Sequence, residues 1–248
     1  MSALRASTSL LQVDALEARH GLLKAVRAVS FSCAAGDVVA LVGANGAGKT
    51  TLLRAIAGAH PLTSGRVLFD GADISRLRTP QRVRLGIALV PEGRRLFGGM
   101  SVEENLRVAA MHARPGPWNL DRVLDAFPQL RPKLKALAGT LSGGQQQATA
   151  IARALMTNPR LLLLDEISLG LSPIAVEQVY QSLQALLGQG TTIVLVEQDL
   201  TRAMDFARRV ICMLEGDIAL QGARDALSRE QIVGAYFGLA RGAGPLAH

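Results

Sequence analysis

The organisation of this 248-residue chain is set by one stretch, Gly43-Ala44-Asn45-Gly46-Ala47-Gly48-Lys49-Thr50. It matches in full the pattern G-x-x-x-x-G-K-[ST], whose glycines let backbone N–H groups turn inward around a phosphate. The apolar run 37–42 before it predicts a buried strand, and 51–57 after it predicts a helix. The partly positive N-terminus of that helix points at the same phosphate. The stretch therefore predicts a phosphate-binding loop between a strand and a helix.

Two side chains of the loop bring chemistry beyond the backbone. Lys49 supplies a full positive charge at the β- and γ-phosphates of a nucleotide, and the hydroxyl of Thr50 is placed to ligate Mg²⁺. The loop therefore predicts a nucleoside triphosphate bound together with Mg²⁺.

A second feature is the aliphatic run 161–164, which is followed by Asp165-Glu166. An α/β sheet binds its ligand at the carboxyl ends of its strands, so both acids are expected to face the phosphate loop. Asp165 is suited to hold Mg²⁺ through water, and Glu166 to orient or deprotonate an attacking water. The alternative is a solvated turn after a strand, which the phosphate loop elsewhere in the chain disfavours.

A third feature is Leu141-Ser142-Gly143-Gly144-Gln145, which opens an apolar-periodic helix over 146–155. A Ser-Gly-Gly step at a helix N-terminus is a second anion site made of backbone N–H groups. If both sites serve one ATP, the simplest geometry is a dimer in which the second site reaches across. The alternative is an ordinary helix start with Ser142 as its cap.

Composition limits the class of protein. Hydrophobic residues make up 49% and charged residues 19%, so a sizeable core is expected and disorder is not. Aromatic residues make up only 4%, which argues against a surface on which nucleic-acid bases stack. The net charge of +7 suits nucleotides, nucleic acid or an anionic membrane without choosing among them. Cys33 and Cys212 lie far apart and predict two buried thiols.

Strand and helix patterns alternate, which predicts an α/β fold with a parallel sheet and a partly antiparallel sheet at the front. Strands are expected over 10–17, 25–33, 37–42, 65–71, 86–91, 161–164, 191–196, 210–214 and 218–220. Helices are expected over 51–57, 146–155, 176–187, 200–208 and 224–237. The capping box Ser101–Glu104 predicts a further helix, and Pro115, Pro117, Pro128 and Pro132 then divide the chain into short helical pieces.

The three motifs, in this order, resemble the nucleotide-binding subunit of an ABC transporter, and the resemblance covers almost the whole chain. It implies a P-loop NTPase core with a mixed parallel sheet, an antiparallel β subdomain and a helical subdomain. The single ABC ATPase domain is expected over 8–238, with the helical subdomain inserted at about 93–155 and a flexible tail at 239–248.

Smaller features resemble one of the two ATPase subunits of branched-chain amino-acid uptake systems. They are the stretches 90–97, 100–106, 168–173, 196–199 and 235–238. The resemblance implies an ATPase that powers import; urea and amide importers have closely similar subunits. It also implies membrane-spanning permease subunits as partners, and a sister ATPase subunit in a heterodimer or a second copy. A periplasmic or extracellular binding protein is a partner only indirectly, and nucleic acid is not expected.

The implied location is peripheral, on the cytoplasmic face of the inner (plasma) membrane. The longest purely aliphatic run, 161–164, is far shorter than the ~20 residues that cross a bilayer, so membrane action is expected through a partner chain.

The resemblance also implies roles for individual residues. It implies that the phosphates and Mg²⁺ are bound by Gly43, Ala44, Asn45, Gly46, Ala47, Gly48, Lys49, Thr50 and Thr51. It implies that the γ-phosphate bound in the opposite subunit is contacted by Ser142, Gly143, Gly144 and Gln145. Glu166 is implied as the general base, and the loop 168–173 as part of the dimer interface.

Three positions depart from the usual pattern of the family. Glu92 replaces a Gln in the loop that contacts Mg²⁺ and the membrane subunit, and a carboxylate there still reaches Mg²⁺ or its waters. Gln198 replaces the His near the γ-phosphate, so this switch residue has no titratable proton. His20 replaces the Tyr that stacks on adenine, although a plain turn residue beside Gly21 is the alternative.

Two groups of arginines remain. Arg76, Arg78, Arg82 and Arg84 are interpreted as a solvated face. Arg94 and Arg95 lie in the stretch that resembles the membrane-coupling loop, where partner contact and solvation are equally favoured.

Two other functions compete with a transport ATPase. A soluble ABC ATPase acting on nucleic acid or ribosomes usually has two cassettes or a long coiled coil, whereas this chain has one cassette and no sustained heptads. A small-molecule P-loop kinase has no use for the stretch 141–145.

Overall fold

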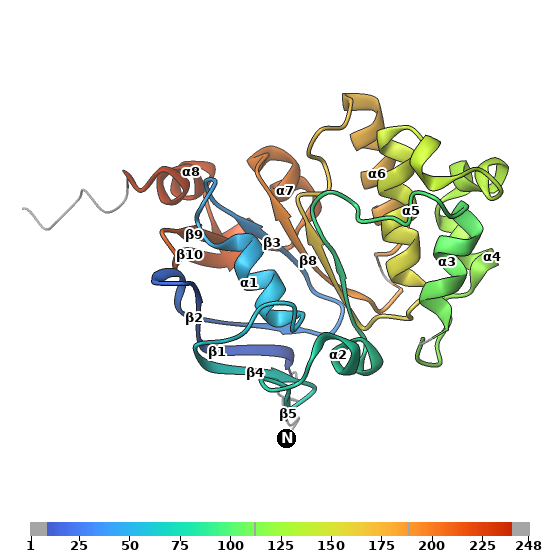
Figure 1. Ribbon diagram of the computed structural model, residues 1–248. Coiled ribbons are helices and arrows are strands. Elements are labelled where there is room, and N and C mark those ends of the chain that lie inside the picture. The colour runs from blue at the N-terminus through green and yellow to red at the C-terminus, as the bar shows by residue number, and fades with distance from the viewer. Residues whose placement is uncertain (1–8, 112, 188, 240–248) are drawn as a thin grey trace, which may run out of the picture.

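The computed structural model describes residues 9–111, 113–187 and 189–239. Two sheets form the body of the chain, and helices cover the larger sheet and separate the two (Figure 1). Position 8 and, apart from Leu239, the expected tail 239–248 lie outside the described residues.

The larger sheet has six strands in the order β10-β9-β3-β8-β7-β6. Their bounds are β3 Val38–Val42, β6 Ile87–Val90, β7 Leu161–Asp165, β8 Thr192–Glu197, β9 Arg209–Leu214 and β10 Asp217–Ala223. The neighbours from β9 to β6 pair in parallel, and β10 pairs antiparallel with β9. This confirms the predicted mixed sheet.

The central strands of this sheet are buried on both faces. Leu161 and Leu163 of β7 pack into one hydrophobic cluster, and Leu162 and Leu164 pack into the other. Successive side chains of a strand point to opposite faces, so a strand covered on both sides becomes a continuous apolar run. That is why the run 161–164 predicted a strand correctly.

The smaller sheet is antiparallel, with the order β2-β1-β4-β5. Its strands are β1 Ser9–His20, β2 Leu23–Ala34, β4 Ser64–Phe69 and β5 Ala72–Asp73. Helix α1, Lys49–Ile56, lies between the two sheets and packs its apolar side chains into the cluster they share (Figure 1). The predicted antiparallel subdomain is therefore confirmed, and it covers the helix that follows the phosphate loop.

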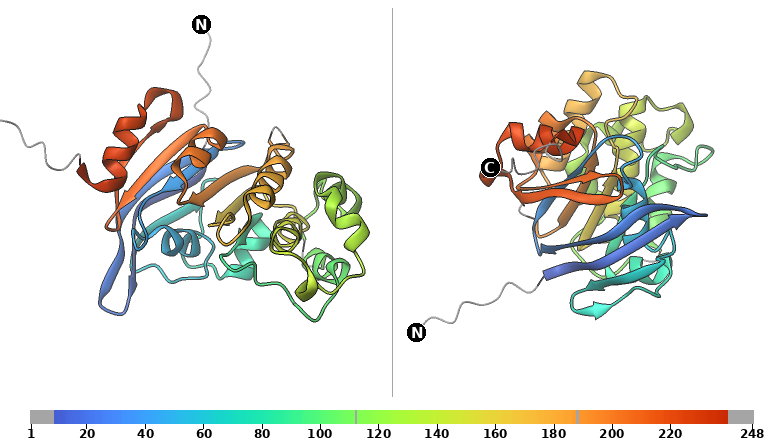
Figure 2. Two further views of the ribbon diagram at one scale, coloured as in Figure 1. Left: turned by 90° about the horizontal axis from the view of Figure 1, so that it is seen from above. Right: turned by 90° about the vertical axis from the view of Figure 1, so that its left-hand side faces the viewer.

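The other face of the large sheet carries most of the remaining helices. They are α3 Val102–Ala110, α4 Leu120–Ala126, α5 Gly143–Leu155, α6 Pro173–Gln184 and α7 Leu200–Phe206, with 3₁₀ turns η1 Pro128–Lys133 and η2 Ala138–Thr140. The capping box of Ser101 and Glu104 opens α3, as predicted. Helix α8, Arg229–Phe237, packs beside β9 and β10 at the opposite end of the molecule from α3 and α4 (Figure 2). Within the described ranges, no helix has the length and apolar character that crossing a membrane requires.

The structure corrects the interpretation of Arg82 as part of a solvated face. Helix α2, Thr79–Leu85, was not predicted from the sequence, and within it Arg82 is only 1% exposed. Its guanidinium donates to the carbonyls of Ala55 and Ile56 at 2.8 and 2.7 Å, where α1 ends. A cation is stabilised at the C-terminal end of a helix, so Arg82 fastens α2 to the end of the helix that follows the phosphate loop.

Two predicted helix boundaries are also corrected. Helix α6 begins at Pro173 rather than at 176, because Ser172 caps it and proline suits the first helical position. The segment 224–237 is divided into η3, Arg224–Ala226, and α8, because Ser228 starts a new helix with its own capping box.

The two cysteines are buried free thiols, as predicted. Burial raises the pKa of Cys33 to about 12 and that of Cys212 to about 11. Neither is a thiolate at neutral pH, so both act as small apolar side chains.

Candidate functional site

Four neighbouring parallel strands, in the order β3, β8, β7 and β6, end at one edge of the large sheet. The phosphate loop follows β3, and Gln198 follows β8. Asp165 ends β7 and Glu166 follows it, while Glu92 comes two residues after β6. Since parallel strands present their carboxyl ends together, these residues meet although they are far apart in the sequence.

The phosphate loop is packed tightly between β9 and β2. Gly43 and Gly48 have φ angles of +152° and +98°. A Cβ on Gly43 would lie 2.3 Å from the carbonyl oxygen of Met213, and one on Gly48 would lie 2.2 Å from that of Ala25. Only glycine fits this conformation and this close approach. The loop shape is therefore imposed by the two strands that enclose it.

Lys49 lies inside the curve of the loop. Its Nζ donates to the carbonyl oxygens of Gly43 at 2.7 Å and Ala44 at 3.0 Å. Burial lowers the pKa of Lys49, and the nearby carboxylates of Glu166 and Asp165 oppose that shift. The loop thus holds a desolvated cation at its centre, where it attracts an anion more strongly than a solvated lysine does.

Asp165 is 1% exposed and is joined to the loop. The hydroxyl of Thr50 donates to its Oδ1 at 2.9 Å, whereas its Oδ2 is buried and has no hydrogen-bond partner. Burial raises the pKa of Asp165, against the hydrogen bond from Thr50, which lowers it. A buried carboxylate oxygen without a donor is costly unless a cation or water meets it. Carboxylate and hydroxyl oxygens are also the ligands that Mg²⁺ prefers.

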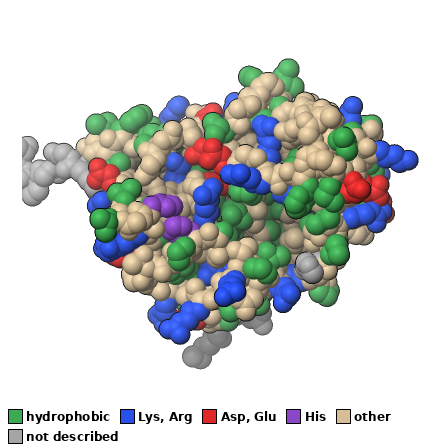
Figure 3. All heavy atoms as spheres, viewed as in Figure 1, with side chains coloured by type: hydrophobic (Ala, Val, Ile, Leu, Met, Phe, Trp, Pro, Cys, Tyr) green, Lys and Arg blue, Asp and Glu red, His purple; other side chains and the backbone are tan. Residues whose placement is uncertain are grey.

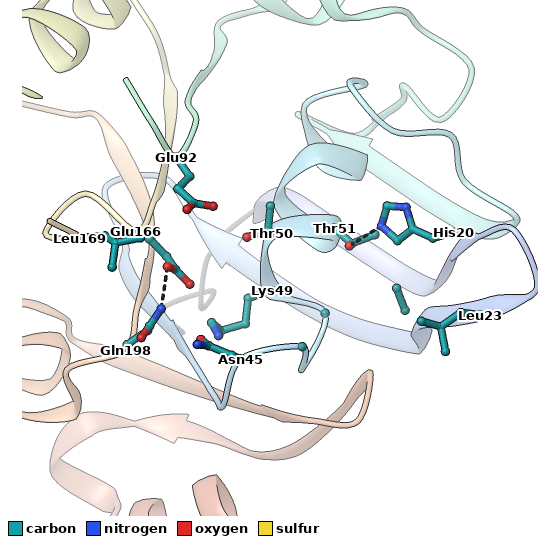
Figure 4. Close-up of a pocket in the computed structure, with 13 residues that line it drawn as sticks. His20, Leu23, Asn45, Lys49, Thr50, Thr51, Glu92, Glu166, Leu169 and Gln198 are labelled. Atoms are coloured by element: carbon teal, nitrogen blue, oxygen red, sulfur yellow. Dashed lines mark hydrogen bonds between the residues drawn. The ribbon is translucent and has the colours of Figure 1, made fainter. Parts of the chain in front are cut away.

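Glu166 and Gln198 are joined directly. Nε2 of Gln198 donates to Oε2 of Glu166 at 2.7 Å (Figure 4). Glu166 has a φ of +48°, in the left-handed region that side-chain-bearing residues rarely adopt. Such conformations persist where the surrounding structure holds them, and they gather at functional sites.

Most of these residues, though not Asp165, line one open cavity of about 480 Å³ (Figure 4). Ten predicted site residues line it: His20, Asn45, Gly46, Gly48, Lys49, Thr50, Thr51, Glu92, Glu166 and Gln198. Three more, Gly43, Ala44 and Ala47, belong to the same loop without lining the cavity. Sequence reasoning missed Leu23 and Ala25, which line the cavity from β2 with no motif to mark them.

His20 stands at the end of the cavity away from Glu166 (Figure 4). Its Nε2 lies 3.1 Å from the hydroxyl oxygen of Thr51. Its ring also packs against His60, with centroids 4.6 Å apart, and the two histidines are seen side by side in Figure 3. Nε2 of His60 donates to the carbonyl of Arg19 at 3.0 Å. His20 therefore ends a strand beside Gly21 and also faces the cavity, held by a second histidine that sequence reasoning did not find.

The predicted second anion site lies apart from this cavity. Ser142 caps α5 in a reciprocal capping box with Gln145. None of the residues 142–145 lines the cavity. Gly144 packs closely on α6, where an added Cβ would lie 2.8 Å from that of Ala175. The chain therefore carries two separated helix N-termini, as the sequence predicted.

The loop after β6 approaches α5. Arg94 and Arg95 have φ angles of +64° and +50°. Nη1 of Arg94 donates to Gln146 at 2.7 Å, and Nη2 of Arg153 donates to the carbonyl of Arg95 at 2.8 Å. These bonds tie the segment that contains Glu92 to the helix opened by Ser142.

No three His, Cys, Asp or Glu side chains gather as a metal cage anywhere in the described part of the chain. Mg²⁺ does not need such a cage, because it is usually held by one or two carboxylates together with substrate phosphates.

Comparison with known proteins relates this geometry to a family. A family model described as ABC transporter matches residues 26–168. The high-affinity branched-chain amino acid transport ATP-binding protein BraG of Pseudomonas aeruginosa is 39% identical over 232 residues, which are 92% of this chain and 100% of that protein. The probable branched-chain amino acid transport ATP-binding protein LivF of Archaeoglobus fulgidus is 38% identical over 77% of this chain and 82% of its own.

Among solved structures, the fold is similar to a nucleotide-free ATP-binding cassette from an ABC transporter, with a TM-score of 0.80 and 27% identity over 92% of this chain and 98% of that one. The ADP conformation of MJ1267, an ATP-binding cassette of an ABC transporter, also has a TM-score of 0.80, with 27% identity over 93% and 99% of the two chains.

Proposed function

Since the chain belongs to the ABC transporter family, we propose that it hydrolyses ATP to power import of branched-chain or related amino acids through separate permease subunits. It is the ATP-binding, ATP-hydrolysing subunit, and it is similar to ATPases of branched-chain amino-acid transport. The observation that carries the proposal is the cavity in which Lys49, Thr50, Glu166 and Gln198 meet.

ATP occupies this cavity with its phosphates in the loop and its base toward His20. The N–H groups of the loop and Lys49 bind the phosphates, while the imidazole of His20 offers the base a ring to stack on. Thr50, Asp165 and Glu92 hold Mg²⁺, and the unpartnered Oδ2 of Asp165 is the observation that fits a cation there. When bound, Mg²⁺ neutralises charge on the phosphate oxygens.

The catalytic work then falls to the two residues after β7 and β8. Glu166 orients the attacking water and accepts its proton, and Gln198 holds the Glu166 carboxylate through the 2.7 Å hydrogen bond. Because Gln198 has no titratable proton, it acts as a donor and not as an acid or base. Catalysis thus rests on positioning and on stabilising charge.

A second subunit completes the site. The N-terminus of α5, with Ser142, Gly143, Gly144 and Gln145, contacts the γ-phosphate bound in the opposite subunit, and the loop 168–173 lies in the dimer interface. The support is that residues 142–145 do not line the cavity of their own chain, whereas Leu169 of the loop 168–173 lies at its rim. The partner is the sister ATPase subunit or a second copy of this chain.

The permease docks beside the helical insert, residues 93–155. A groove of about 310 Å³ lies between α2, α3 and α5, and its lining includes Phe97, Val108 and Arg153. Phe97 and Val108 expose 52% and 37% of their surfaces, and the guanidinium of Arg153 lies 5.6 Å from the centre of the Phe97 ring. An apolar groove with a cationic rim suits a short helix of a permease. Docked there, the chain lies on the cytoplasmic face of the plasma membrane.

The proposal is tested by assembling the chain with its sister ATPase and permease subunits in vesicles. ATP turnover is measured with the binding protein added alone, with leucine, isoleucine or valine, and with urea or acetamide. Stimulation of ATP turnover by the branched-chain amino acids supports the proposed cargo. Stimulation by urea or acetamide alone would show that the cargo is urea or an amide instead. ATP turnover that no loaded binding protein changes would contradict a role in import.

A further inference from the structure

A buried carboxylate with no role in the mechanism above immediately precedes Gln198, which lines the cavity. Glu197 is the last residue of β8 and is only 1% exposed. Burial raises its pKa, and hydrogen bonds from Ser168 and Tyr180 oppose that shift. Burying an acid is unfavourable unless its oxygens are hydrogen-bonded, so the donors around this group indicate what it holds in place.

Both carboxylate oxygens of Glu197 accept a hydrogen bond, each from a different segment. The hydroxyl of Ser168, in the loop after β7, donates to Oε2 at 2.8 Å. The hydroxyl of Tyr180, in α6, donates to Oε1 at 2.9 Å. The Tyr180 ring packs edge-on against Phe206 of α7, with ring centroids 5.5 Å apart. The carboxylate thereby fastens β8, the loop after β7 and α6 to one another.

Two of the three fastened segments, β8 and the loop after β7, lead directly to the Glu166–Gln198 pair. Glu197 immediately precedes Gln198, and Ser168 follows Glu166 by two residues. The N–H of Glu166 already donates to the Val196 carbonyl at 3.1 Å, and the clamp adds a side-chain tie beyond it, at the point where the Glu166 and Gln198 side chains reach their 2.7 Å hydrogen bond. Glu166 is held with a φ of +48° next to this clamp, a conformation that needs such support.

We propose that Glu197 is a positioning residue: held by Ser168 and Tyr180, it fixes the Glu166–Gln198 pair in the geometry that hydrolysis requires. This inference rests on the function proposed above, because Glu197 makes no contact with ATP in it and acts only through the Glu166–Gln198 pair. A displacement of well under 1 Å in a catalytic group is enough to slow a reaction. Loosening the clamp should therefore lower kcat and leave ATP binding intact.

The most specific test is Tyr180→Phe, which keeps the ring packed on Phe206 and removes the hydroxyl. Ser182→Ala is the matched control, because Ser182 is also buried in α6 but donates to the carbonyl of Gln178 at 3.0 Å. We expect Tyr180→Phe to lower kcat about fivefold to tenfold, the effect of one hydrogen bond, with the KM for ATP unchanged within about twofold. Ser182→Ala should keep the wild-type kcat.

Combining each change with Gln198→Ala separates positioning from stability. If the clamp acts through the Glu166–Gln198 pair, Tyr180→Phe should cause little further loss of kcat once Gln198 is gone. The same fold loss in both backgrounds, or a wild-type kcat for Tyr180→Phe alone, would overturn the inference. Glu197→Gln, of nearly the same size, provides a second variant in which kcat should fall while KM stays the same.

The same assays distinguish failure of the proposed mechanism from failure of the role of Glu197. If Glu166→Gln and Gln198→Ala both keep full ATP turnover, the proposed mechanism fails and the role of Glu197 falls with it. If those two variants lose turnover while Tyr180→Phe and Glu197→Gln retain it, only the role of Glu197 is wrong.

Discussion

Helices α1 and α5 both begin at sites that the sequence predicts to bind phosphate, yet their N-termini are built differently. Helix α1 starts at Gly48 with no side chain capping it, so its first N–H groups remain directed into the loop. Helix α5 starts at Ser142, whose hydroxyl accepts from the N–H of Gln145 at 3.4 Å. The first site lies in a cavity and the second does not. The difference fits the composite site proposed above, in which one chain binds the nucleotide and a second chain completes the site.

The largest expected effect tests the phosphate loop at the N-terminus of α1. Lys49→Ala removes the buried cation at the centre of the loop, and we expect ATP turnover to fall at least about 100-fold, together with loss of ATP binding. Lys24→Ala is the control: it also removes one lysine charge, but Lys24 is half-buried in a pair with Glu17 at 3.1 Å and does not line the cavity. Binding of a fluorescent ATP analogue and phosphate release measure both effects. An Lys49→Ala chain that still binds ATP as the wild type does would contradict the role of the loop.

A second change separates function from stability within the same region. Asp165→Asn keeps the shape of the side chain and the acceptor for Thr50 but removes the buried charge. We expect turnover with Mg²⁺ to fall on the order of 100-fold. We also expect the free energy of unfolding of the nucleotide-free chain to rise, because burial disfavours the charged form of Asp165.

The pH dependence of stability checks this assignment. The pKa of Asp165 is raised on folding, so the folded chain binds this proton more tightly than the unfolded chain does. The stabilisation from this tighter proton binding is fully present below the ordinary carboxyl pKa of 3.8. It is lost as the pH rises through the pKa that Asp165 has in the folded chain. The stability gap between Asp165→Asn and the wild type should therefore open with rising pH in thermal unfolding. A constant gap would show that the charge is not its cause.

The smallest of these effects tests the N-terminus of α5. Ser142→Ala and Ser228→Ala each remove the cap of a capping box, from α5 and α8 respectively, and each should cost about 1 kcal/mol of unfolding free energy. Only Ser142→Ala should also lower ATP turnover, by about tenfold, because in the proposed dimer α5 meets a phosphate and α8 does not. Equal turnover in the two variants would reduce Ser142 to an ordinary cap.

Local motifs made the centre of the site predictable from sequence. The phosphate loop and the acids after 161–164 each follow a buried strand, and both patterns lie within a few adjacent residues. The rule that parallel strands present their carboxyl ends together then brings the loop, Glu166 and Gln198 to one edge. The fold class followed from the same alternation of strands and helices.

Other parts depend on long-range packing that leaves little local signal. His60 packs on His20 from forty residues away, and Arg82 looked like one of several surface arginines until its guanidinium was seen to meet the end of α1. Some misses did have a local signal. Ser172-Pro173 marks the start of α6, and Ser228 with Gln231 marks the start of α8, so both helix starts carry a capping signal in the sequence.

The most direct test of the two-region account is the mass of a Glu166→Gln chain in solution, by light scattering, with its sister subunit present or absent. Glu166→Gln is expected to stop hydrolysis and trap bound ATP. The account predicts a dimer with Mg-ATP, single chains with ADP, and no dimer when Ser142→Arg places a bulky cation at the N-terminus of α5. Single chains in Mg-ATP even with the sister subunit, or an unchanged dimer with Ser142→Arg, would contradict it.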